Sequence, residues 1–179
     1  MLQFCANLSL LFTEVPLPER FQFASQCGFS AVEIQFPYSL EPEYLLELLS
    51  ANHLKLVLFN VDADDLLQGG EGLAAVPEKT YQFQGALAQA LKYAEHLKPD
   101  VINVLPGRCL NPERRQEYLH TFKQNLTLAL KTFAPLRINT VFEAINHFDM
   151  PGCLINTEQN MLNMLQSIQH SNIYMNYDI

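Results

Sequence analysis

The sequence predicts an α/β protein in which residues 1–179 form a single domain, a partial (β/α)8 TIM barrel with about six strands and five helices. Short apolar runs alternate with longer segments of helical periodicity, and such alternation favours parallel strands joined by crossover helices. The composition, 49% hydrophobic and 17% charged, is that of a packed domain. Polar residues also stand at the ends of the predicted strands, where barrel enzymes build their sites.

The first half of the chain is expected to supply three strands and two helices. Short apolar runs flanked by turn residues are typical of buried strands. They lie at residues 2–8, 31–35 and 54–59. Pro18 opens the first helix and Gly28 ends it, because proline fits the first helical turn and glycine fits the left-handed position after the last. Pro42 opens the second helix in the same way.

A long loop follows the third predicted strand after Asn60. It contains the glycine-rich segment 69–72, and long glycine-bearing loops in compact domains often carry function. The acidic residues of this loop lack the spacing and the closing glutamate of an EF-hand, so we interpret them as a solvated face. These residues are Asp62, Asp64 and Asp65.

The second half is expected to supply three further strands and three helices. The strands are predicted at residues 101–105, 137–143 and 173–177. The clearest helix begins after Pro77 and ends before Pro99. The next runs from Pro112 to Phe133, and Thr157 is a favourable N-cap for the last. Each helix carries apolar residues at helical spacing, which indicates one buried face.

The segment 141–152 contains a strand that ends in a carboxylate. Apolar residues lead to Glu143, after which a polar stretch closed by Pro151 and Gly152 cannot continue a strand. An ionised carboxylate in an apolar site costs several kcal/mol or more unless it is paired or bound to a metal. Glu143 therefore either has such a partner or faces water at the end of its strand.

Polar residues stand at or near the carboxyl ends of all six predicted strands. They are Asn7, Glu33, Asn60, Asn103, Glu143 and Asp178. This placement favours a barrel over a doubly wound open sheet, because no G-x-G-x-x-G fingerprint follows the first strand. A complete barrel needs roughly 250 residues and eight units. We therefore expect the C-terminal barrel units to be absent from this sequence.

Charge and cysteine content argue against several classes of partner. The formal net charge is −8, and Arg114 and Arg115 are the only adjacent basic residues, which disfavours nucleic acid as a partner. The cysteines lack zinc-site spacing and are expected to be free thiols of a reducing compartment. Neither a secretory signal nor a membrane span is predicted, so we expect a cytoplasmic protein without a membrane partner.

Several short segments form a pattern that extends through the whole chain. They are FCANLS at residues 4–9, QCGF at 26–29, VE at 32–33, FPY at 36–38, IN at 102–103, PG at 106–107, EAINHFDMPG at 143–152 and YDI at 177–179. Together they resemble the hydroxypyruvate isomerase family, which belongs to the xylose isomerase-like TIM barrels. The stretch around Glu143 is the most specific part of this resemblance.

The resemblance implies isomerisation of a small 2-oxo acid, hydroxypyruvate to tartronate semialdehyde, through a metal-stabilised enediolate. It implies that Glu143 is both a metal ligand and a proton-transferring group, and that Asp178 is a second ligand. A carboxylate must reach the proton beside the carbonyl, and oxygen ligands suit Mg2+ or Mn2+. The family takes a Gln and a second catalytic Glu from later strands. We therefore expect the 179-residue chain alone to be inactive and to bind metal weakly.

Four further residues are candidate substrate contacts. Arg108 has the guanidinium shape that suits a substrate carboxylate, with a solvated surface arginine as the alternative. Asn60 and Asn103 stand at strand ends. Phe59 occupies a position where the family often carries His, which leaves any polar role there to Asn60. His147 either touches substrate or is a structural residue bonded to a nearby carbonyl.

The sequence leaves three functional hypotheses open. The first is the isomerase, with a 2-oxo-tetronate or other sugar-acid isomerase as its nearest rival and a DNA-cleaving barrel disfavoured by the net charge. The second is a catalytically inactive remnant that acts only as a binding or assembly partner. The third is an open-sheet fold that binds a small molecule. In a six-stranded arc the first and sixth strands would be open edges, so a homo-oligomer is one expected outcome.

Overall fold

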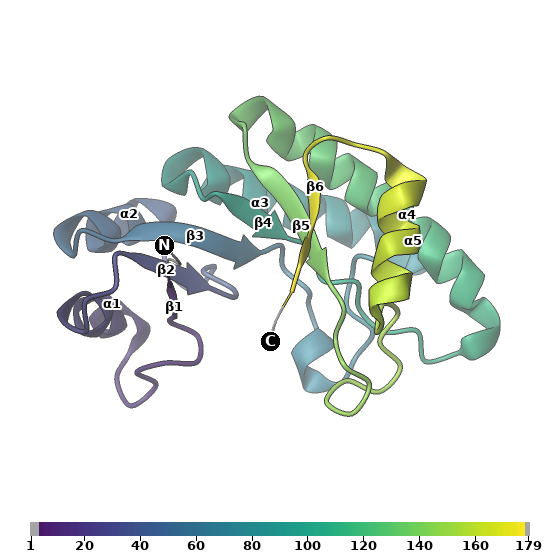
Figure 1. Cartoon of the computed structure of the whole chain (residues 1–179), viewed down its shortest axis with the longest axis horizontal. Helices are drawn as coiled ribbons and strands as arrows, with labels where there is room; N and C mark the ends of the chain where they lie inside the picture. Colours follow the sequence, from purple (N-terminus) through teal and green to yellow (C-terminus); the bar gives the residue numbers. More distant parts are fainter. Residues whose placement is uncertain (1–3, 178–179) are drawn as a thin grey trace.

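The computed structural model describes residues 4–177, which form one six-stranded parallel sheet in the order β1-β2-β3-β4-β5-β6 (Figure 1). The strands are β1 (Ala6–Asn7), β2 (Ala31–Ile34), β3 (Lys55–Asn60), β4 (Val101–Asn103), β5 (Asn139–Glu143) and β6 (Ile173–Asn176). The helices are α1 (Leu17–Gln26), α2 (Pro42–Ala51), α3 (Thr80–Leu97), α4 (Arg115–Phe133) and α5 (Glu158–Ile168). This order confirms the predicted α/β class and its strict alternation of strands and helices.

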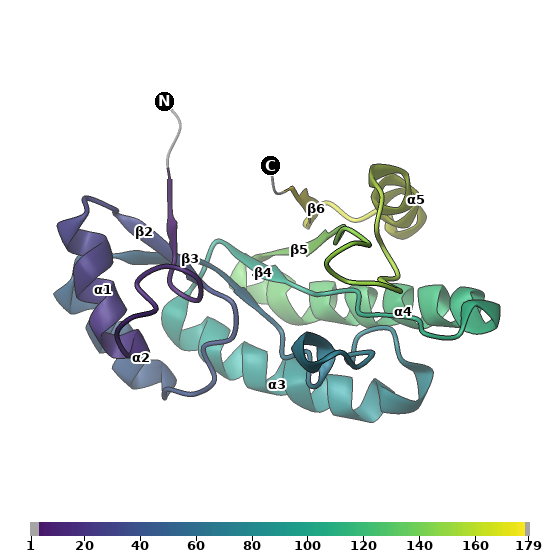
Figure 2. The same ribbon diagram turned by 90° about the horizontal axis from the view of Figure 1, so that it is seen from below.

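The helices cover the outer side of the curved sheet (Figure 2). Apolar side chains of the three central strands are fully buried beneath them: Phe59, Ile102 and Phe142 each have an exposed fraction of 0%. The Phe142 ring meets Phe122 of α4 edge to face, with ring centroids 6.1 Å apart. The other side of the sheet opens between the edge strands β1 and β6 (Figure 2).

Three strands, β1, β4 and β5, are shorter by two residues or more than their apolar runs predicted, and β2 and β6 are shorter by one. β1 ends at Asn7 because the Asn7 carbonyl accepts a turn hydrogen bond of 3.1 Å from the amide of Leu10. β4 ends at Asn103, two residues earlier than predicted and three residues before Pro106, which has no N–H to give to a strand ladder. β5 begins two residues later than predicted because Arg137 has a φ of 60°, a left-handed conformation that closes the preceding 3-10 turn.

The acidic side chains of the loop after β3 lie partly exposed, as predicted, and in addition hold the loop together. Asp65 accepts a hydrogen bond of 3.0 Å from the amide of Gly72. The ammonium of Lys79 lies 3.0 Å from Asp64 and 3.3 Å from Asp65. Both carboxylates remain partly exposed, but their charges are paired and close the loop on itself.

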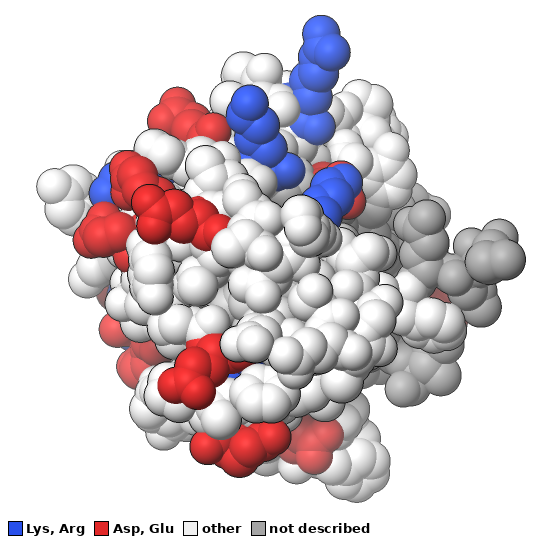
Figure 3. All heavy atoms as spheres, turned by 90° about the vertical axis from the view of Figure 1, so that its left-hand side faces the viewer, with Lys and Arg blue, Asp and Glu red and all other residues white. Residues whose placement is uncertain are grey.

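The surface and helices carry two findings that bear on partners. On the face formed by α1 and α2, basic side chains gather mostly at one end and acidic ones are spread over the rest (Figure 3). That distribution differs from the basic stripe of a nucleic-acid-binding surface. Within residues 4–177, every helix is too short or too polar to cross a bilayer.

Candidate functional site

Polar residues pair with one another across the carboxyl ends of the strands. Asn7 is in register with Glu33, Asn60 with Asn103, and Glu143 with Asn176. Successive side chains of a strand point to opposite faces, and Phe59, Ile102 and Phe142, each next to one of these polar residues, are fully buried under the helices. The polar side chains therefore share the side of the sheet that the helices leave open. Of the six predicted strand-end residues, Asp178 lies outside the described residues.

Three side chains from adjacent strands form what we call the Glu143 corner: Asn60 of β3, Asn103 of β4 and Glu143 of β5. The Asn103 amide nitrogen donates to Glu143 Oε1 at 2.6 Å and to Asn60 Oδ1 at 3.1 Å. Glu143 is half-buried, whereas Asn60 and Asn103 are 4% and 1% exposed. A carboxylate that ends an apolar strand thus has a partner, one of the two outcomes that the sequence allowed.

The structure gives Asn60 and Asn103 a contact that the sequence did not predict. Both were candidate substrate contacts, yet both are almost fully buried, and the two N–H groups of Asn103 are both engaged within the corner. A substrate contact by either residue stays a prediction. What the structure shows is that they touch each other and that Asn103 touches Glu143.

A second carboxylate has a similar arrangement in what we call the Glu33 corner: Cys5, Asn7 and Glu33. The Asn7 amide nitrogen donates to Glu33 Oε1 at 2.6 Å, and Cys5 Sγ lies 3.9 Å from Glu33 Oε2. Burial, followed by the charge of Glu33, raises the pKa of the Cys5 thiol. The sequence placed Glu33 at a strand end without giving it a role, although it interrupts an apolar strand as Glu143 does.

Arg108 is fixed between two loops beside the end of β4. Its backbone amide donates to the Glu71 carbonyl at 3.0 Å, and its guanidinium Nη1 donates to the Gly69 carbonyl at 3.3 Å. The preceding Gly107 has a φ of 75°, and a Cβ there would lie 2.4 Å from the Glu71 oxygen, so this approach requires glycine. The residue also forms an isolated antiparallel bridge with Cys153. The predicted contact with a substrate carboxylate stays a prediction.

His147 lies on the exposed turn that follows β5. The Asn146 side chain orders this turn by accepting hydrogen bonds from the amides of Phe148 and Asp149, at 2.9 and 3.0 Å. The His147 ring is 3.9 Å from that of Phe148, centroid to centroid, and both residues are exposed. The structure therefore places His147 on an exposed turn, and its role toward substrate stays a prediction.

The predicted metal site can be compared with the structure for one of its two ligands. Glu143 is described, and Asp178 lies outside the described residues. Among residues 4–177, no three His, Cys, Asp or Glu side chains come close enough together to hold a metal ion. The donors at the Glu143 corner are carboxylate and amide oxygens, the hard type that Mg2+ and Mn2+ prefer. The donor chemistry fits, and the complete ligand set stays a prediction.

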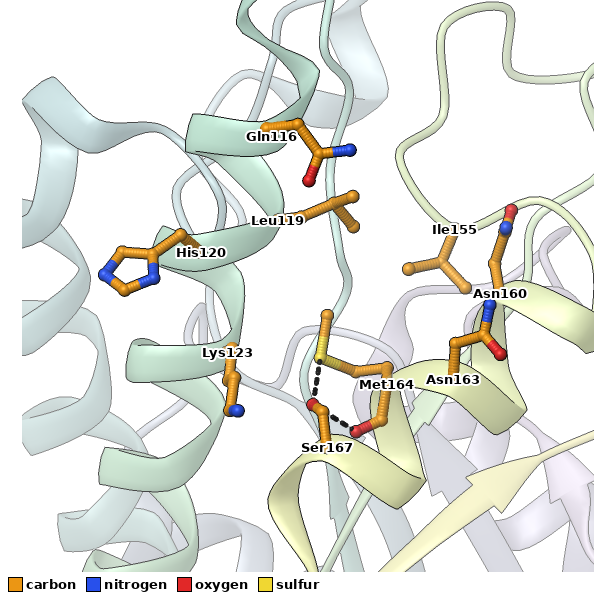
Figure 4. Close-up of a pocket in the computed structure, with 9 residues that line it drawn as sticks. All are labelled: Gln116, Leu119, His120, Lys123, Ile155, Asn160, Asn163, Met164 and Ser167. Carbon is orange, nitrogen blue, oxygen red and sulfur yellow. Dashed lines mark hydrogen bonds between the residues drawn. The ribbon is translucent and has the colours of Figure 1, made fainter.

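A groove on the helix layer lacks the chemistry of the strand ends. It has a volume of about 390 Å³ and lies between α4 and α5 (Figure 4). Its walls combine apolar and amide side chains, while His120 points away from it (Figure 4). Ser167 is bonded within its own helix, to the Met164 carbonyl at 2.8 Å. Because no carboxylate lines it, this groove is a weaker candidate for proton transfer than the strand ends.

Comparison with known proteins gives a matching family and two similar isomerases. The family model described as xylose isomerase-like TIM barrel matches residues 21–179. The hydroxypyruvate isomerase of Escherichia coli K12 is 35% identical over 179 residues, which cover 100% of this chain and 69% of that protein. The 2-oxo-tetronate isomerase of Pectobacterium atrosepticum is 36% identical over 178 residues, 99% of this chain and 68% of that protein.

A solved structure agrees with these sequence matches. The crystal structure described as an AP endonuclease, family 2, from Brucella melitensis superposes with a TM-score of 0.95 at 31% identity. The superposition covers 100% of this chain and 69% of that one. The similarity therefore includes every strand and helix described above.

Proposed function

Since this chain belongs to the xylose isomerase-like TIM barrel family, we propose that it interconverts hydroxypyruvate and tartronate semialdehyde. The observation that carries this proposal is the Glu143 carboxylate, held at the end of β5 by a hydrogen bond of 2.6 Å from Asn103. The similarity to two isomerases, at 35% and 36% identity, supports the reaction class.

The reaction moves hydrogen between adjacent carbons and needs no oxidant. C3 of hydroxypyruvate loses a proton, the C2 carbonyl becomes a hydroxyl, the C3 hydroxyl becomes an aldehyde, and a proton is added to C2. A carboxylate beside the substrate can take a proton from one carbon and regain its charge when a proton is returned. We assign this role to Glu143, because a base must be held steadily against the carbon that it serves.

Two further assignments complete the proposal. Glu143 and Asp178 would hold a divalent cation, Mg2+ or Mn2+, as the oxygen donors of the corner allow. When bound, such an ion supplies a Lewis acid that stabilises negative charge on substrate oxygens. The half-buried guanidinium of Arg108 would bind the substrate carboxylate, which matches its planar fork of N–H groups.

A 2-oxo-tetronate isomerase is the second candidate function. The observation that favours it is the identity of 36% to the Pectobacterium enzyme, equal in practice to the 35% for hydroxypyruvate isomerase. Both activities act on a carbonyl next to a carboxylate, so the same residues would serve either. The substrates differ in length, and the ratio of their kcat/KM values separates the two assignments.

The test measures turnover of both substrates with Mg2+ or Mn2+. It uses the chain itself and an extended chain, in which the part of the E. coli hydroxypyruvate isomerase beyond the match is joined after Ile179. We expect the extended chain to convert hydroxypyruvate and the 179-residue chain to be inactive. Failure of the extended chain on both substrates would overturn the isomerase proposal, and preference for 2-oxo-tetronate would select the second candidate.

Location and partners are also proposals. All four cysteines are free, which supports a reducing compartment, and we propose the cytoplasm. A net charge of −8 disfavours DNA as a substrate, even though a structural relative is described as an endonuclease. Pairing between copies through the edges of β1 or β6 stays a prediction.

A further inference from the structure

Asn103 occupies a buried position on an inner strand, where asparagine is unusual. It lies on β4, a strand with neighbours on both sides, and only 1% of its surface is exposed. Asparagine is depleted in strands, and a buried amide is costly unless it is hydrogen-bonded. Ile102 beside it shows that this strand otherwise carries apolar side chains. Its amide therefore serves something that an apolar side chain could not.

The hydrogen bonds of Asn103 admit only one orientation of its amide. Its nitrogen faces two acceptors, Asn60 Oδ1 at 3.1 Å and Glu143 Oε1 at 2.6 Å. If the amide were turned over, its oxygen would face both of these oxygens and repel them. The opposite flip of Asn60 would set two donors against each other. The oxygen of Asn60 thus selects the end of Asn103 that meets Glu143.

Asn60 is itself anchored by the backbone on either side of its side chain. The main-chain carbonyl of Asn60 accepts a hydrogen bond of 2.6 Å from the Tyr38 hydroxyl, and its main-chain N–H donates to the Gln35 carbonyl at 2.8 Å. Tyr38 is packed edge to face against Tyr93 of α3, with ring centroids 5.1 Å apart. The chain of contacts therefore begins at Tyr93 in the helix layer and ends at the carboxylate.

Asn103 Oδ1 is buried and has no hydrogen-bond partner among the described residues. An unpaired buried acceptor is a cost that proteins rarely accept without return. Here the fold accepts it while both N–H groups of the same amide stay engaged. The donors of Asn103 are thus the part of the side chain that the structure uses.

We propose that Asn60 and Asn103 form an amide relay that positions Glu143, with Asn103 holding the plane of the carboxylate and Asn60 fixing the orientation of Asn103. Both are positioning residues rather than substrate contacts. The role rests on the proposed function of Glu143 as the proton-transferring group. A carboxylate that can rotate loses the alignment with carbon that proton transfer requires.

The kinetic test separates positioning from substrate binding. In the extended chain we expect Asn103→Leu to lower kcat between about 10-fold and 100-fold with KM changed less than about twofold. Asn60→Leu should lower kcat less, and should add nothing in the Asn103→Leu background, because its effect passes through Asn103. Asn60→Asp keeps the acceptor oxygen, so its kcat should be closer to that of the wild type than to that of Asn60→Leu. A raised KM at unchanged kcat would overturn the relay in favour of a substrate contact.

Thr140 provides the matched control. It lies on β5, is fully buried, and its hydroxyl has no hydrogen-bond partner among the described residues. Thr140→Val therefore removes a buried polar atom from the same sheet without touching the relay, and we expect kcat and KM to stay at their wild-type values. A loss like that of Asn103→Leu would show that the sheet responds to any such change, and would overturn the proposal.

A second measurement uses the 179-residue chain and needs no turnover. The side-chain amide signals of Asn103, assigned by their loss in Asn103→Leu, should exchange with water slowly in the wild type. Glu143→Ala and Asn60→Leu should each speed this exchange at least about 10-fold. Unchanged exchange in both variants would overturn the relay. If no substrate is turned over but exchange responds as expected, the proposed function fails and the relay stands.

Discussion

The Glu33 corner and the Glu143 corner hold their carboxylates in the same way but brace them differently. In each, an asparagine from the preceding strand donates to Oε1 of the glutamate at 2.6 Å. In the Glu33 corner the asparagine is oriented locally, because its oxygen accepts the amide of Ser9, two residues later, at 2.9 Å. In the Glu143 corner it is oriented by Asn60, 43 residues away in sequence.

The asparagine of the Glu33 corner is oriented by a local turn, whereas the asparagine of the Glu143 corner is oriented by a contact between strands. A bond to the second residue along the chain can form without any distant contact, whereas the Asn60 bond exists only once β3 and β4 have paired. The Glu33 corner also includes β1, an edge strand of two residues, while the Glu143 corner includes only strands with neighbours on both sides. The brace between strands therefore supports the proton-transfer role that we propose for Glu143.

The largest expected effect comes from removing each carboxylate in turn. Glu143→Gln in the extended chain should keep the fold and lower kcat at least about 100-fold, the lower range for losing a general base. Glu33→Gln should cost less than about 10-fold, because no proton transfer is assigned to it. Steady-state kinetics with hydroxypyruvate give both values. Equal losses would show that both corners act on the reacting carbon.

Removing each asparagine compares the braces as contributions to stability. Asn103→Ala leaves the Asn60 and Glu143 oxygens without their buried donor and should lower the free energy of unfolding by about 2 kcal/mol. Asn7→Ala should cost about 1 kcal/mol or less, because water can reach the exposed edge of the sheet. Urea unfolding of the 179-residue variants measures both. A larger loss for Asn7→Ala would reverse the ranking of the two corners.

Arg108 tests which corner the substrate faces. Arg108→Ala should raise KM about 10-fold at nearly unchanged kcat, because this residue is expected to bind the substrate equally well in the ground and transition states. Arg108→Lys keeps the positive charge but loses the planar guanidinium, so its KM should lie between those of the wild type and Arg108→Ala. The same KM ratio in the Glu33→Gln background would place the substrate carboxylate away from the Glu33 corner. An unchanged KM in Arg108→Ala would remove this residue from the site.

The smallest effect probes the Glu33 corner through its thiol. Burial and the charge of Glu33 raise the pKa of Cys5, so less thiolate is present at a given pH. Glu33→Gln removes the negative charge, which should lower that pKa and speed alkylation by iodoacetamide about twofold to threefold at pH 8. Cys27, which is exposed and distant in sequence, serves as the internal control. Slower alkylation of Cys5 in the variant would contradict the contact.

Local patterns predicted the elements well and their ends less well. Helical periodicity, prolines and an N-cap identify the helices, and the Thr157 side chain does accept the amide of Asn160 at 3.2 Å. Most strands were predicted too long, because an apolar run does not reveal where pairing stops. Backbone geometry decides that point, as the left-handed Arg137 shows for β5.

Local sequence patterns are enough to predict that this chain alternates strands with helices and that Glu143, at the end of an apolar strand, faces water or has a partner. They do not predict that this partner is Asn103, 40 residues earlier, or that Asn60 bonds to Asn103; the folded sheet brings these residues together. Periodicity within a segment states which face a side chain takes, but the register between strands is absent from it. In β2 that register even shifts between Val32 and Glu33. Contacts across strands arise from the packing of whole helices and strands, and no local window of sequence contains them.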